Sequence, residues 1–388
     1  MLREIEVDLH DGQKAIIESR KRFNHIRCHR RFGKSILSYN LLAETAGMGE
    51  PAAFIMPTAV EYAKRWAECV EGLAPIIADV KVSEGIITLI SGGRIEFFGL
   101  HRYDGIRGNH YGRVIIDEAA HSPYLEQAWL YAISPTLADL KGDAYFFSTP
   151  NGSNYFKQLE DKHRGDVDWS FTHIPITSPL RNPAIDDEEI QRQKNNLPTV
   201  VWDQEWLANY VDLSGARIKR EWLQWFNEPP KDLFISMGVD LAISTKTSAD
   251  YTACVVTGRD ESGMLYVLDV QRIQQGFHGI INFIESMYRQ WQPVIIGIET
   301  VQFQQAVVEE LLLKGLPVQG MRPTRDKVSR FLHVEGKIEH KQLSFSRSLP
   351  AEFTEELLAF PQGKHDDMVD ALVYAVDSSY NTFQVITL

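Results

Sequence analysis

Short apolar runs recur along this chain, and they restrict its possible folds more than any other feature of the sequence. Three examples are "AAFIM" (52–56), "RVIID" (113–117) and "DAYFFS" (143–148). Such runs are typical of strands that helices cover on both faces, as in parallel sheets. Helical patterns lie between them along the whole sequence. The alternation of strand and helix therefore predicts an α/β fold.

Length and composition limit the class of protein. The chain has 388 residues, of which 44% are hydrophobic and 24% charged, so it is long enough for two soluble globular domains. Cys28, Cys69 and Cys254 are far apart, a pattern that suits a reducing cytosol and gives no disulfide framework. No apolar run resembles a signal peptide or approaches the ~18 residues of a membrane span. We therefore expect a cytoplasmic protein without a membrane segment.

Positive charge is concentrated in one segment, although the net charge of the chain is −12. An acidic total disfavours indiscriminate binding to nucleic acid. The segment 20–34 nevertheless has no carboxylate and carries Arg20, Lys21, Arg22, Arg27, Arg30, Arg31 and Lys34. A basic run of this kind can face phosphate groups while carboxylates elsewhere set the total charge.

The order of the expected elements divides the chain into two domains. We expect the first over 1–212, with a lid or linker region near 180–212, then a linker over 213–232 and a second domain over 233–388. The second domain begins with three consecutive strands, followed by a helix, a strand and further helices. This order is that of a ribonuclease-H-like domain.

The segment "CHRRFGKS" (28–35) has the end of a phosphate-binding loop between a strand and a helix. The usual spacing requires glycine at the position that Cys28 occupies. Backbone N–H groups of such a loop and of the helix N-terminus bind anionic phosphates. Gly33 belongs to this turn, Lys34 would neutralise the outer phosphates, and Ser35 would bind the metal ion. Because Gly-Lys-Ser is common in itself, the loop needs support from other motifs.

Three further features support a nucleotide site. Asp117 and Glu118 follow a buried strand in "VIIDEA", where the aspartate can hold the metal through water and the glutamate can polarise the attacking water. Ser148 and Thr149 in "STPNG" could sense the γ-phosphate, and Gln13 lies where several helicase-like motors read the adenine edge. Each feature also has a plain alternative: a polar strand end, a turn, or a solvated surface residue. Their combination in this order predicts ATP hydrolysis.

The arginines of the loop have a candidate role in that reaction. A phosphoryl-transfer transition state spreads negative charge over the γ-oxygens, and an arginine supplied by the same chain can stabilise it. Arg30, four residues before Lys34, is the preferred candidate. Arg31 could instead face DNA or a carboxylate, and Arg107 in "GIRGNH" is a second candidate finger. Both loop arginines could also belong only to the basic run.

Acidic residues end two strands of the second domain and begin its last helix. They are Asp240 in "MGVD", Glu299 in "IGIE", and Asp366, Asp367 and Asp370 in "KHDDMVDALVYA". Strand ends and a helix start can converge, and oxygen-only ligands favour Mg²⁺ or Mn²⁺ over zinc. A pair of such ions ~3.5–4 Å apart can activate water and stabilise the leaving oxygen of a phosphodiester. Without metal, such a cluster should be strained or partly protonated.

Several acidic and basic residues have alternative roles. Asp366 could be an ordinary helix N-cap, and Asp370 and Asp250 could be structural or could support the metal ligands indirectly. The basic segment "RPTRDKVSR" could track a phosphate backbone or form a solvated helix face. Its charged members include Arg322, Arg325, Lys327 and Arg330.

These motifs together resemble one protein family. "HRRFGKS", "IRG", "VIIDEAA", "STPNG", "GVD", "GIE" and "HDDMVDA" occur in the order found in the large terminase subunit of tailed bacteriophages, a family that includes DNA-packaging proteins of herpesviruses. The resemblance covers nearly the whole chain. It implies a P-loop (RecA/ASCE-like) ATPase domain followed by a ribonuclease-H-like nuclease domain. The missing first glycine is usual in that family, in which an arginine within the loop is the pattern.

The resemblance also implies roles for individual residues. For ATP hydrolysis it implies Lys34, Ser35, Asp117 and Glu118, with Arg30 as the finger supplied by the same chain. Gly33, Arg31 and Gln13 are further candidate nucleotide contacts from the reading of the residues themselves. Ser148 and Thr149 resemble the motif that couples hydrolysis to movement. Asp240, Glu299, Asp366 and Asp367 resemble the metal ligands of the nuclease.

The implied function is viral DNA packaging. ATP hydrolysis would drive double-stranded DNA into a procapsid, and a nuclease dependent on Mg²⁺ or Mn²⁺ would cut concatemers. Expected partners are double-stranded DNA, a portal protein, a small terminase subunit and further copies of the chain in a ring, all in the host-cell cytoplasm. The alternatives are a helicase-like translocase-nuclease of repair or restriction, and a non-catalytic DNA-binding scaffold whose sites have decayed.

Overall fold

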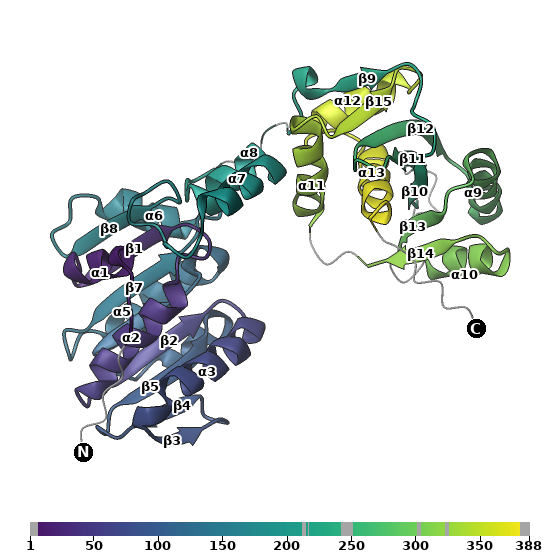
Figure 1. Ribbon diagram of the computed structural model, residues 1–388. Helices are drawn as coiled ribbons and strands as arrows, with labels where there is room; N and C mark the ends of the chain where they lie inside the picture. The colour runs from purple at the N-terminus through teal and green to yellow at the C-terminus, as the bar shows by residue number, and fades with distance from the viewer. Residues whose placement is uncertain are drawn as a thin grey trace. The chain divides into compact units, whose positions relative to one another are not determined.

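The computed structural model describes residues 7–211, 215, 217–241, 251–300, 304–322 and 326–380, with the backbone alone at 59 and 60. The chain forms two compact units, drawn in Figure 1. Unit 1 comprises Met1–Gln193 and Val200–Asp212, and unit 2 comprises Lys194–Thr199 and Leu213–Leu388. Helices α7 (Asp187–Asn196) and α8 (Thr199–Val201) cross the boundaries between these segments.

The described part of unit 1 is built on an eight-stranded sheet with the order β3-β4-β5-β2-β6-β7-β1-β8. Six neighbouring strands, from β5 to β8 in this order, are parallel, and β3 and β4 extend the sheet in antiparallel fashion. The strands are β1 Phe23–Cys28, β2 Ala52–Met56, β3 Ile77–Lys81, β4 Ile86–Leu89, β5 Arg94–Gly99, β6 Arg113–Ile116, β7 Asp143–Ser148 and β8 Trp169–Ile174.

Helices cover both faces of this sheet, which explains why its strands are apolar throughout. Phe54 and Tyr145 belong to one core cluster, whereas their neighbours Ile55 and Phe146 belong to the cluster on the opposite face. The α/β architecture expected from the sequence is thereby confirmed. The longer helices of unit 1 are α1 Asp11–Glu18, α2 Lys34–Gly47, α3 Ala59–Leu73 and α6 Tyr155–His163, and shorter ones are η2 Leu100–Ile106, η3 Ala119–His121, α4 Leu125–Ala128, η4 Trp129–Ile133 and α5 Ser134–Thr136.

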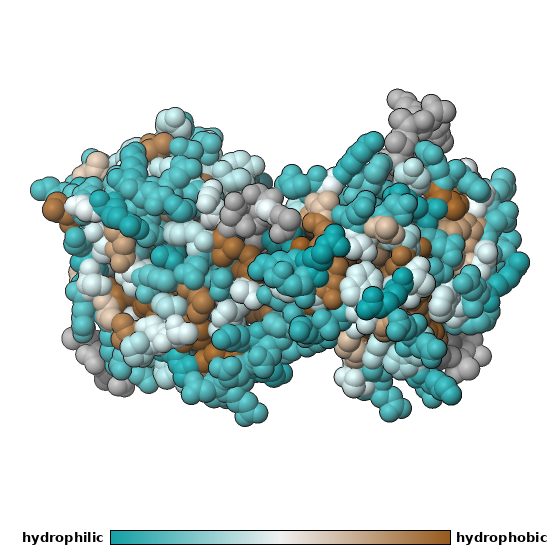
Figure 2. All heavy atoms as spheres, turned by 90° about the horizontal axis from the view of Figure 1, so that it is seen from above, coloured by the Kyte–Doolittle hydropathy of each residue, from teal (hydrophilic) through white to brown (hydrophobic). Residues whose placement is uncertain are grey.

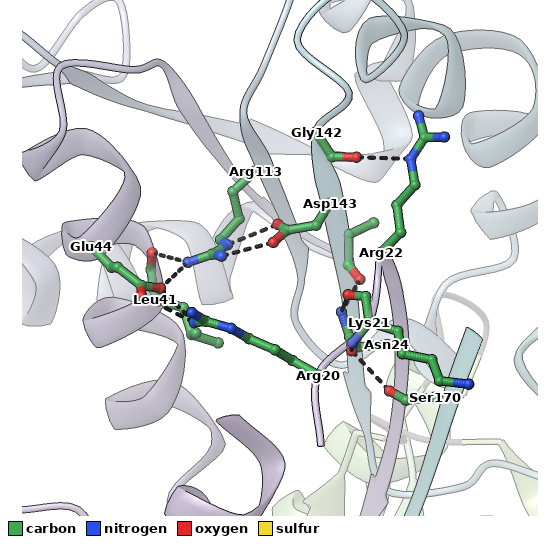
Figure 3. Close-up of polar contacts among 11 residues, drawn as sticks. Arg20, Lys21, Arg22, Asn24, Leu41, Glu44, Arg113, Gly142, Asp143 and Ser170 are labelled. Atoms are coloured by element: carbon green, nitrogen blue, oxygen red, sulfur yellow. Dashed lines mark hydrogen bonds and ion pairs between the residues drawn. The ribbon is translucent and has the colours of Figure 1, made fainter. Parts of the chain in front are cut away.

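A buried arginine joins α2 to the starts of β6 and β7. Arg113 donates two hydrogen bonds to Asp143, at 2.8 and 2.7 Å, and pairs with Glu44 at 2.6 Å. Glu44 also receives two hydrogen bonds from Arg20, and Figure 3 shows the four side chains together. Such a pair is costly to break, because the remaining charge would stay buried.

Part of the basic run 20–34 therefore supports the scaffold of unit 1. Arg20 pairs with Glu44, and Arg22 donates to the carbonyl of Gly142 at 3.3 Å (Figure 3). Arg27 lies 3.5 Å from Glu160 and over the ring of Tyr210. These side chains do not form the phosphate-facing surface that the sequence suggested. Their partners come from elements far along the chain, which the sequence does not reveal.

The described part of unit 2 contains a seven-stranded sheet with the order β14-β13-β10-β11-β12-β15-β9. Strands β10, β11 and β12 are antiparallel neighbours, as three consecutive strands predict, and the remaining pairs are parallel. Strand β9 lies within 213–232, the segment expected to be a linker, and adds an edge to the sheet. The strands are β9 Gln224–Phe226, β10 Phe234–Asp240, β11 Thr252–Arg259, β12 Leu265–Ile273, β13 Ile295–Glu299, β14 Val318–Met321 and β15 Leu343–Ser346.

Besides the short 3₁₀-helix η6 Arg220–Trp222, five longer helices complete the described part of unit 2. They are α9 Phe277–Trp291, α10 Gln305–Leu313, α11 Lys327–Glu339, α12 Ala351–Ala359 and α13 Asp367–Ser378. The apolar residues of α11, α12 and α13 form one core cluster, and those of α9 and α10 form another with the opposite face of the sheet. The expected last helix is thus the buried α13, with Val369, Leu372, Val373 and Val376 in its core face.

Two glycines allow α13 to lie directly on the sheet. Gly238 of β10 and Gly297 of β13 are register partners, each two residues before the acidic end of its strand. A Cβ atom on Gly238 would lie 2.1 Å from the carbonyl oxygen of Ala371 in α13, and one on Gly297 would lie 2.2 Å from the hydroxyl of Ser378. The helix backbone can approach this closely only because both positions lack a side chain.

Hydropathy can be followed on one face of the described residues. Figure 2 shows one face of the molecule, on which hydrophilic residues cover most of the area. Within the described ranges, no helix combines the length and the apolar character needed to cross a bilayer.

Gly238→Ala should destabilise unit 2, because its Cβ atom would overlap the backbone of α13. We expect a loss of about 1–3 kcal/mol in the free energy of unfolding. Differential scanning calorimetry would measure the change. Gly276→Ala is the control, because a Cβ atom there has no neighbour within 4 Å. Equal effects of the two substitutions would show that the contact with α13 is not tight.

Candidate functional site

The phosphate-binding motif forms the connection between β1 and α2, as the sequence predicts. Gly33 precedes the helix with φ 97°, in the left-handed region that favours glycine. Arg31 also has a positive φ of 65°. Backbone N–H groups at the start of α2 have no earlier helical partner, so this end of the 14-residue helix can bind an anion.

Lys34 forms a largely buried ion pair with Glu118 in unit 1. Its ammonium lies 3.3 Å from a carboxylate oxygen of Glu118, and only 9% of the lysine side chain is exposed. Burial opposes both charges, but their mutual attraction outweighs it, so the pKa of Lys34 is raised and that of Glu118 is lowered. Glu118 has φ 49°, and its other oxygen is buried without a hydrogen-bond partner in the described structure. The pair brings together two residues that are 84 positions apart.

Asp117 has a basic partner that the sequence did not suggest. The guanidinium of Arg65 in α3 donates to Asp117 at 3.2 Å and to Glu68 at 3.0 Å. Glu68 in turn accepts a hydrogen bond from the hydroxyl of Tyr39. Burial and the charge of Glu118 raise the pKa of Asp117 to about 6, despite the opposing effect of Arg65. Arg65 belongs to an amphipathic helix, where an isolated arginine gives no signal of a role in a site.

Residues of the "STPNG" segment form hydrogen bonds with the turn that follows Glu118. Ser148 is fully buried at the end of β7 and accepts a hydrogen bond from the backbone of Ala120 at 3.1 Å. The hydroxyl of Thr149 lies 3.3 Å from a ring nitrogen of His121, whose other contact is Glu118 at 3.8 Å. Ser148 and Thr149 are therefore linked by hydrogen bonds to the segment that carries Glu118.

Gln13 lies against the phosphate loop and is not a surface residue. Only 2% of it is exposed. Its amide nitrogen donates to the carbonyl of Gly33 at 3.0 Å, and its amide oxygen accepts from the backbone of His10 at 3.1 Å. The alternative of a solvated Gln13 is therefore wrong. Both ends of the amide are engaged by backbone groups, so Gln13 fixes the loop relative to α1.

Two cavities open beside this loop. One of about 540 Å³ is lined by the start of α1, by Phe32 and Gly33, and by Asn182, Pro183 and Ala184. A second, of about 950 Å³, lies between α2 and α3 and includes Ser35, Tyr39 and Glu68 in its lining. Ser35, at the start of α2, therefore borders the second cavity.

The three candidate arginine fingers have different surroundings. Arg30 and Arg31 are both exposed, and their backbone groups fix the loop through the carbonyl of Glu205 and the amide of Asn182. Arg107 follows η2, is 54% exposed and pairs with Asp104 at 3.3 Å. Neither loop arginine forms a side-chain ion pair within the described residues, so both side chains are available to a ligand of the loop.

Two histidines fix the strand and loop around Cys28. His25 lies on the ring of Phe156 and contacts the carbonyl of that residue at 2.9 Å. His29 lies between the carbonyl of Arg30 at 2.7 Å and the backbone N–H of Asn182 at 3.4 Å, so one ring nitrogen donates and the other accepts. Burial lowers the pKa of each histidine to about 4.

In unit 2, two acidic strand ends lie next to each other. Strands β10 and β13 are parallel neighbours, so Asp240 and Glu299 follow the paired residues Val239 and Ile298. Glu299 accepts a short hydrogen bond from the hydroxyl of Tyr374 in α13. Burial, followed by the charges of Asp370, Asp367 and Glu299, holds the pKa of Asp240 well above its ordinary value. The acidic groups are therefore close enough to repel one another.

The start of α13 adds three aspartates to this group. Asp366 occupies the N-cap position, but its side chain makes no capping hydrogen bond. Asp367 lies 4.0 Å from His365 and Asp370 is buried, with its pKa raised by burial. Because the Asp366 side chain makes no capping hydrogen bond, the alternative of Asp366 as an ordinary N-cap is wrong. Two other residues named from the sequence, Asp250 and Arg325, lie outside the described residues.

Basic residues of α11 occupy the space between these carboxylates. Lys327 lies 2.9 Å from Asp366 and 2.7 Å from Asp370. Arg330 lies 3.5 Å from Asp370 and 3.9 Å from Glu299, and donates a short hydrogen bond to Tyr374. The segment "RPTRDKVSR" is therefore not simply a solvated helix face. Tyr374 is a site residue that the sequence analysis did not single out, although it lies within "KHDDMVDALVYA". Arg330 was named there only as a possible phosphate contact, and its place among the carboxylates is new.

The donor set of unit 2 fits a hard divalent cation. Its groups are carboxylates, whose oxygens are the ligands that Mg²⁺ and Mn²⁺ prefer. Burial and the neighbouring carboxylates raise the pKa of Asp240, so a bound cation would stabilise its ionised form. In the described ranges, however, no three acidic, histidine or cysteine side chains are already arranged around one ion position. The lysine and arginine of α11 provide the compensating charge in this arrangement.

The sequence matches two family models along most of its length. The model "Terminase large subunit, T4likevirus-type, N-terminal" matches residues 30–225, and "Terminase RNaseH-like domain" matches residues 237–379. The chain is also 26% identical over 211 residues to "Terminase, large subunit" of Escherichia phage T5. That alignment covers 52% of this chain and 47% of the relative, so it spans about half the length of the curated protein.

Solved structures share the fold over most of the chain. The large terminase of the thermophilic bacteriophage D6E aligns with a TM-score of 0.69 and 13% identity, over 96% of this chain and 99% of that one. The structure of the same protein in complex with ADP gives equal values. Its complex with ATP-gamma-S gives a TM-score of 0.65 and 14% identity, with the same coverage. At this identity the likeness establishes the fold.

Lowering the pH from 6.5 to 4 should destabilise unit 1 through His25 and His29. The unfolded chain takes up protons near pH 6.5, whereas the folded histidines do so only near pH 4. The contribution of each histidine to the free energy of unfolding is therefore fully present above pH 6.5. It is lost as the pH falls toward 4, by up to about 3 kcal/mol for each histidine. Calorimetric unfolding of the wild type and of His29→Asn would check this. The variant should show a shallower pH dependence, and equal slopes would contradict the assignment.

Proposed function

The chain belongs to the terminase large-subunit family, and on this basis we propose that it is the ATP-hydrolysing and DNA-cutting subunit of a viral packaging motor. One observation carries the proposal: the two units hold separate sets of polar residues, one around a phosphate loop and one around clustered carboxylates. ATP hydrolysis in unit 1 would move double-stranded DNA into a procapsid, and unit 2 would cut concatemers.

The geometry of unit 1 supports the role of an ATPase site. Gly33 and the N-terminus of α2 would bind phosphates, and Lys34 would neutralise the outer ones. Ser35 and Asp117 would hold Mg²⁺, which supplies charge neutralisation when bound, and Glu118 would orient and polarise the attacking water. The ion pair between Lys34 and Glu118 supports this arrangement, because it brings the two groups next to each other at the start of α2.

The nucleoside fits the smaller cavity beside the loop. Its lining by Phe32, Gly33 and the 182–184 segment would place the base next to the phosphates. Gln13 contributes the wall of this cavity, and its own amide is engaged by the loop. The reported ADP and ATP-gamma-S complexes of the D6E terminase support a nucleotide site in this fold.

A coupling role for Ser148 and Thr149 is supported by their hydrogen bonds. Both contact the turn Ala119–His121, which directly follows Glu118. A change at Glu118 when the γ-phosphate leaves would alter this turn and reach the end of β7. We assign to these two residues the transmission of hydrolysis to the rest of unit 1.

In unit 2, Asp240, Glu299, Asp366 and Asp367 would hold one or two divalent cations. When bound, these ions supply a metal-activated water and stabilise the leaving oxygen of the phosphodiester. Asp370 is buried behind them, and Tyr374 orients Glu299 by a hydrogen bond. Carboxylate crowding at Asp240 supports this use of Mg²⁺ or Mn²⁺.

The family assignment supports a role in DNA packaging. The domain bounds, the partners and the location are our proposals. We assign the motor to residues 1–212, including a lid near 180–212, and the nuclease to 233–388. The proposed partners are double-stranded DNA, a portal protein, a small terminase subunit and further copies of the chain in a ring, in the host-cell cytoplasm. A repair or restriction translocase gains no support from these comparisons.

Lys34→Ala and Asp240→Asn should separate the two activities. Lys34→Ala removes the cation that meets the phosphates, so ATP hydrolysis should fall by about 100-fold or more while DNA cleavage stays measurable. Asp240→Asn removes a metal ligand, so cleavage in Mg²⁺ or Mn²⁺ should be lost while hydrolysis continues. Each variant is the control for the other. Loss of both activities in both variants would contradict two independent sites.

Arg30→Ala should lower the turnover of ATP by about 1,000-fold or more while nucleotide binding changes little, because an arginine finger acts on the transition state. Steady-state kinetics and nucleotide titration would separate turnover from binding. Arg31→Ala is the matched control in the same exposed loop, and Arg107→Ala tests the second candidate. A large loss of turnover in either of these, with Arg30→Ala unaffected, would move the role to that residue.

A further inference from the structure

Lys327 holds two of the aspartates at the start of α13. Its ammonium lies 2.9 Å from Asp366 and 2.7 Å from Asp370, so one side chain bridges two carboxylates. Lys327 is the first residue of α11, and Asp326 caps that helix by accepting a hydrogen bond from Ser329. The position of Lys327 opposite α13 is therefore fixed by a capped helix.

Lys327 can leave this position, whereas Arg330 cannot. Half of the Lys327 side chain is exposed, and its partners contact only the ammonium at the end of a flexible stem. Arg330 is 12% exposed and is held by Asp370, Glu299 and Tyr374 together. Moving Lys327 into solvent requires rotations of its side chain alone.

The two ion pairs of Lys327 supply positive charge to the acidic group of unit 2. Asp370 is buried and Asp240 lies among other carboxylates, so positive charge must be present while they are ionised. Arg330 provides part of this charge permanently. Lys327 provides a further charge at the exposed side of the site, on Asp366, which is one of the proposed metal ligands.

We infer that Lys327 is an internal counter-ion of the acidic site, which occupies Asp366 and Asp370 and must be displaced before a divalent cation is bound. The inference rests on the proposed metal-dependent nuclease. Lys327 lowers the affinity of the site for free metal, because binding must break both of its ion pairs. After displacement, its ammonium faces solvent at the edge of the site, where a DNA phosphate would take the place of the aspartates.

A simpler role would be that of a phosphate ligand alone. In that case Lys327 would contribute to DNA binding, and its removal would leave the affinity for metal in the absence of DNA unchanged. A counter-ion predicts the opposite, because removal of the lysine charge leaves the carboxylates uncompensated and more attractive to a cation. The affinity for metal without DNA therefore distinguishes the two roles.

The test is a calorimetric titration of the full chain with Mn²⁺, without nucleotide or DNA. Heat of Mn²⁺ binding that the wild type shows and Asp240→Asn lacks is assigned to the acidic site. Lys327→Gln should bind Mn²⁺ about five-fold or more tightly than the wild type, the scale expected for partly exposed ion pairs. Lys327→Arg, which keeps the charge, should return the affinity toward that of the wild type.

Lys337→Gln is the matched control. Lys337 lies on the same helix, contacts the hydroxyl of Tyr380 at 2.8 Å and loses the same charge on substitution. Ten residues of helix separate it from Lys327, roughly 15 Å, which exceeds the Debye length of about 8 Å at physiological salt. Its affinity for Mn²⁺ should equal that of the wild type.

The outcomes separate the inference from the proposed function. Equal affinities of the wild type, Lys327→Gln and Lys337→Gln would overturn the counter-ion role and leave the nuclease proposal intact. Failure of all of them to bind Mn²⁺ at the acidic site would overturn both. Calorimetric unfolding provides a second readout: Lys327→Gln should melt at a lower temperature than the wild type without metal, and Mn²⁺ should raise its melting temperature by more.

Discussion

Buried carboxylates must be compensated by positive charge, and both candidate sites depend on this constraint. In unit 1, Lys34 compensates Glu118 and Arg65 compensates Asp117. In unit 2, Lys327 and Arg330 compensate the aspartates of α13 and the glutamate at the end of β13. The two sites share no fold element, yet each brings a helix with basic residues against acidic strand ends. A bound divalent cation satisfies the same need, so metal and basic side chain are alternatives at one place.

Scaffold contacts give these charges their positions. Arg113 joins α2 to β6 and β7, so the helix that carries Lys34 is tied to the strands that lead to Glu118 and Ser148 (Figure 3). Gly238 and Gly297 let α13 approach the sheet, which brings its first turn near Asp240 and Glu299. In each unit a structural contact between helix and sheet therefore helps to position the charged groups of the site.

Much of the architecture could be predicted from the sequence. Apolar runs such as "RVIID" and "DAYFFS" predict buried parallel strands, and the structure contains them as β6 and β7. The residues at their ends, Asp117 and Ser148, lie together because parallel strands end at the same edge. The turn to α2 was predictable from Gly33-Lys34-Ser35. These inferences succeed because each depends on a local pattern or on the direction of neighbouring strands.

Other features required the tertiary structure, because they are contacts between residues far apart in the sequence. No local pattern shows that Arg65 pairs with Asp117, that Gln13 is buried against Gly33, or that Lys327 bridges two aspartates. The basic run 20–34 likewise has several carboxylate and carbonyl partners that only the packing reveals. The sequence by itself determined which groups are present at the strand ends and the alternation of strand and helix. The tertiary structure decided which opposite charges meet, because the free energy of an ion pair depends on distance and burial, which the order of residues does not contain.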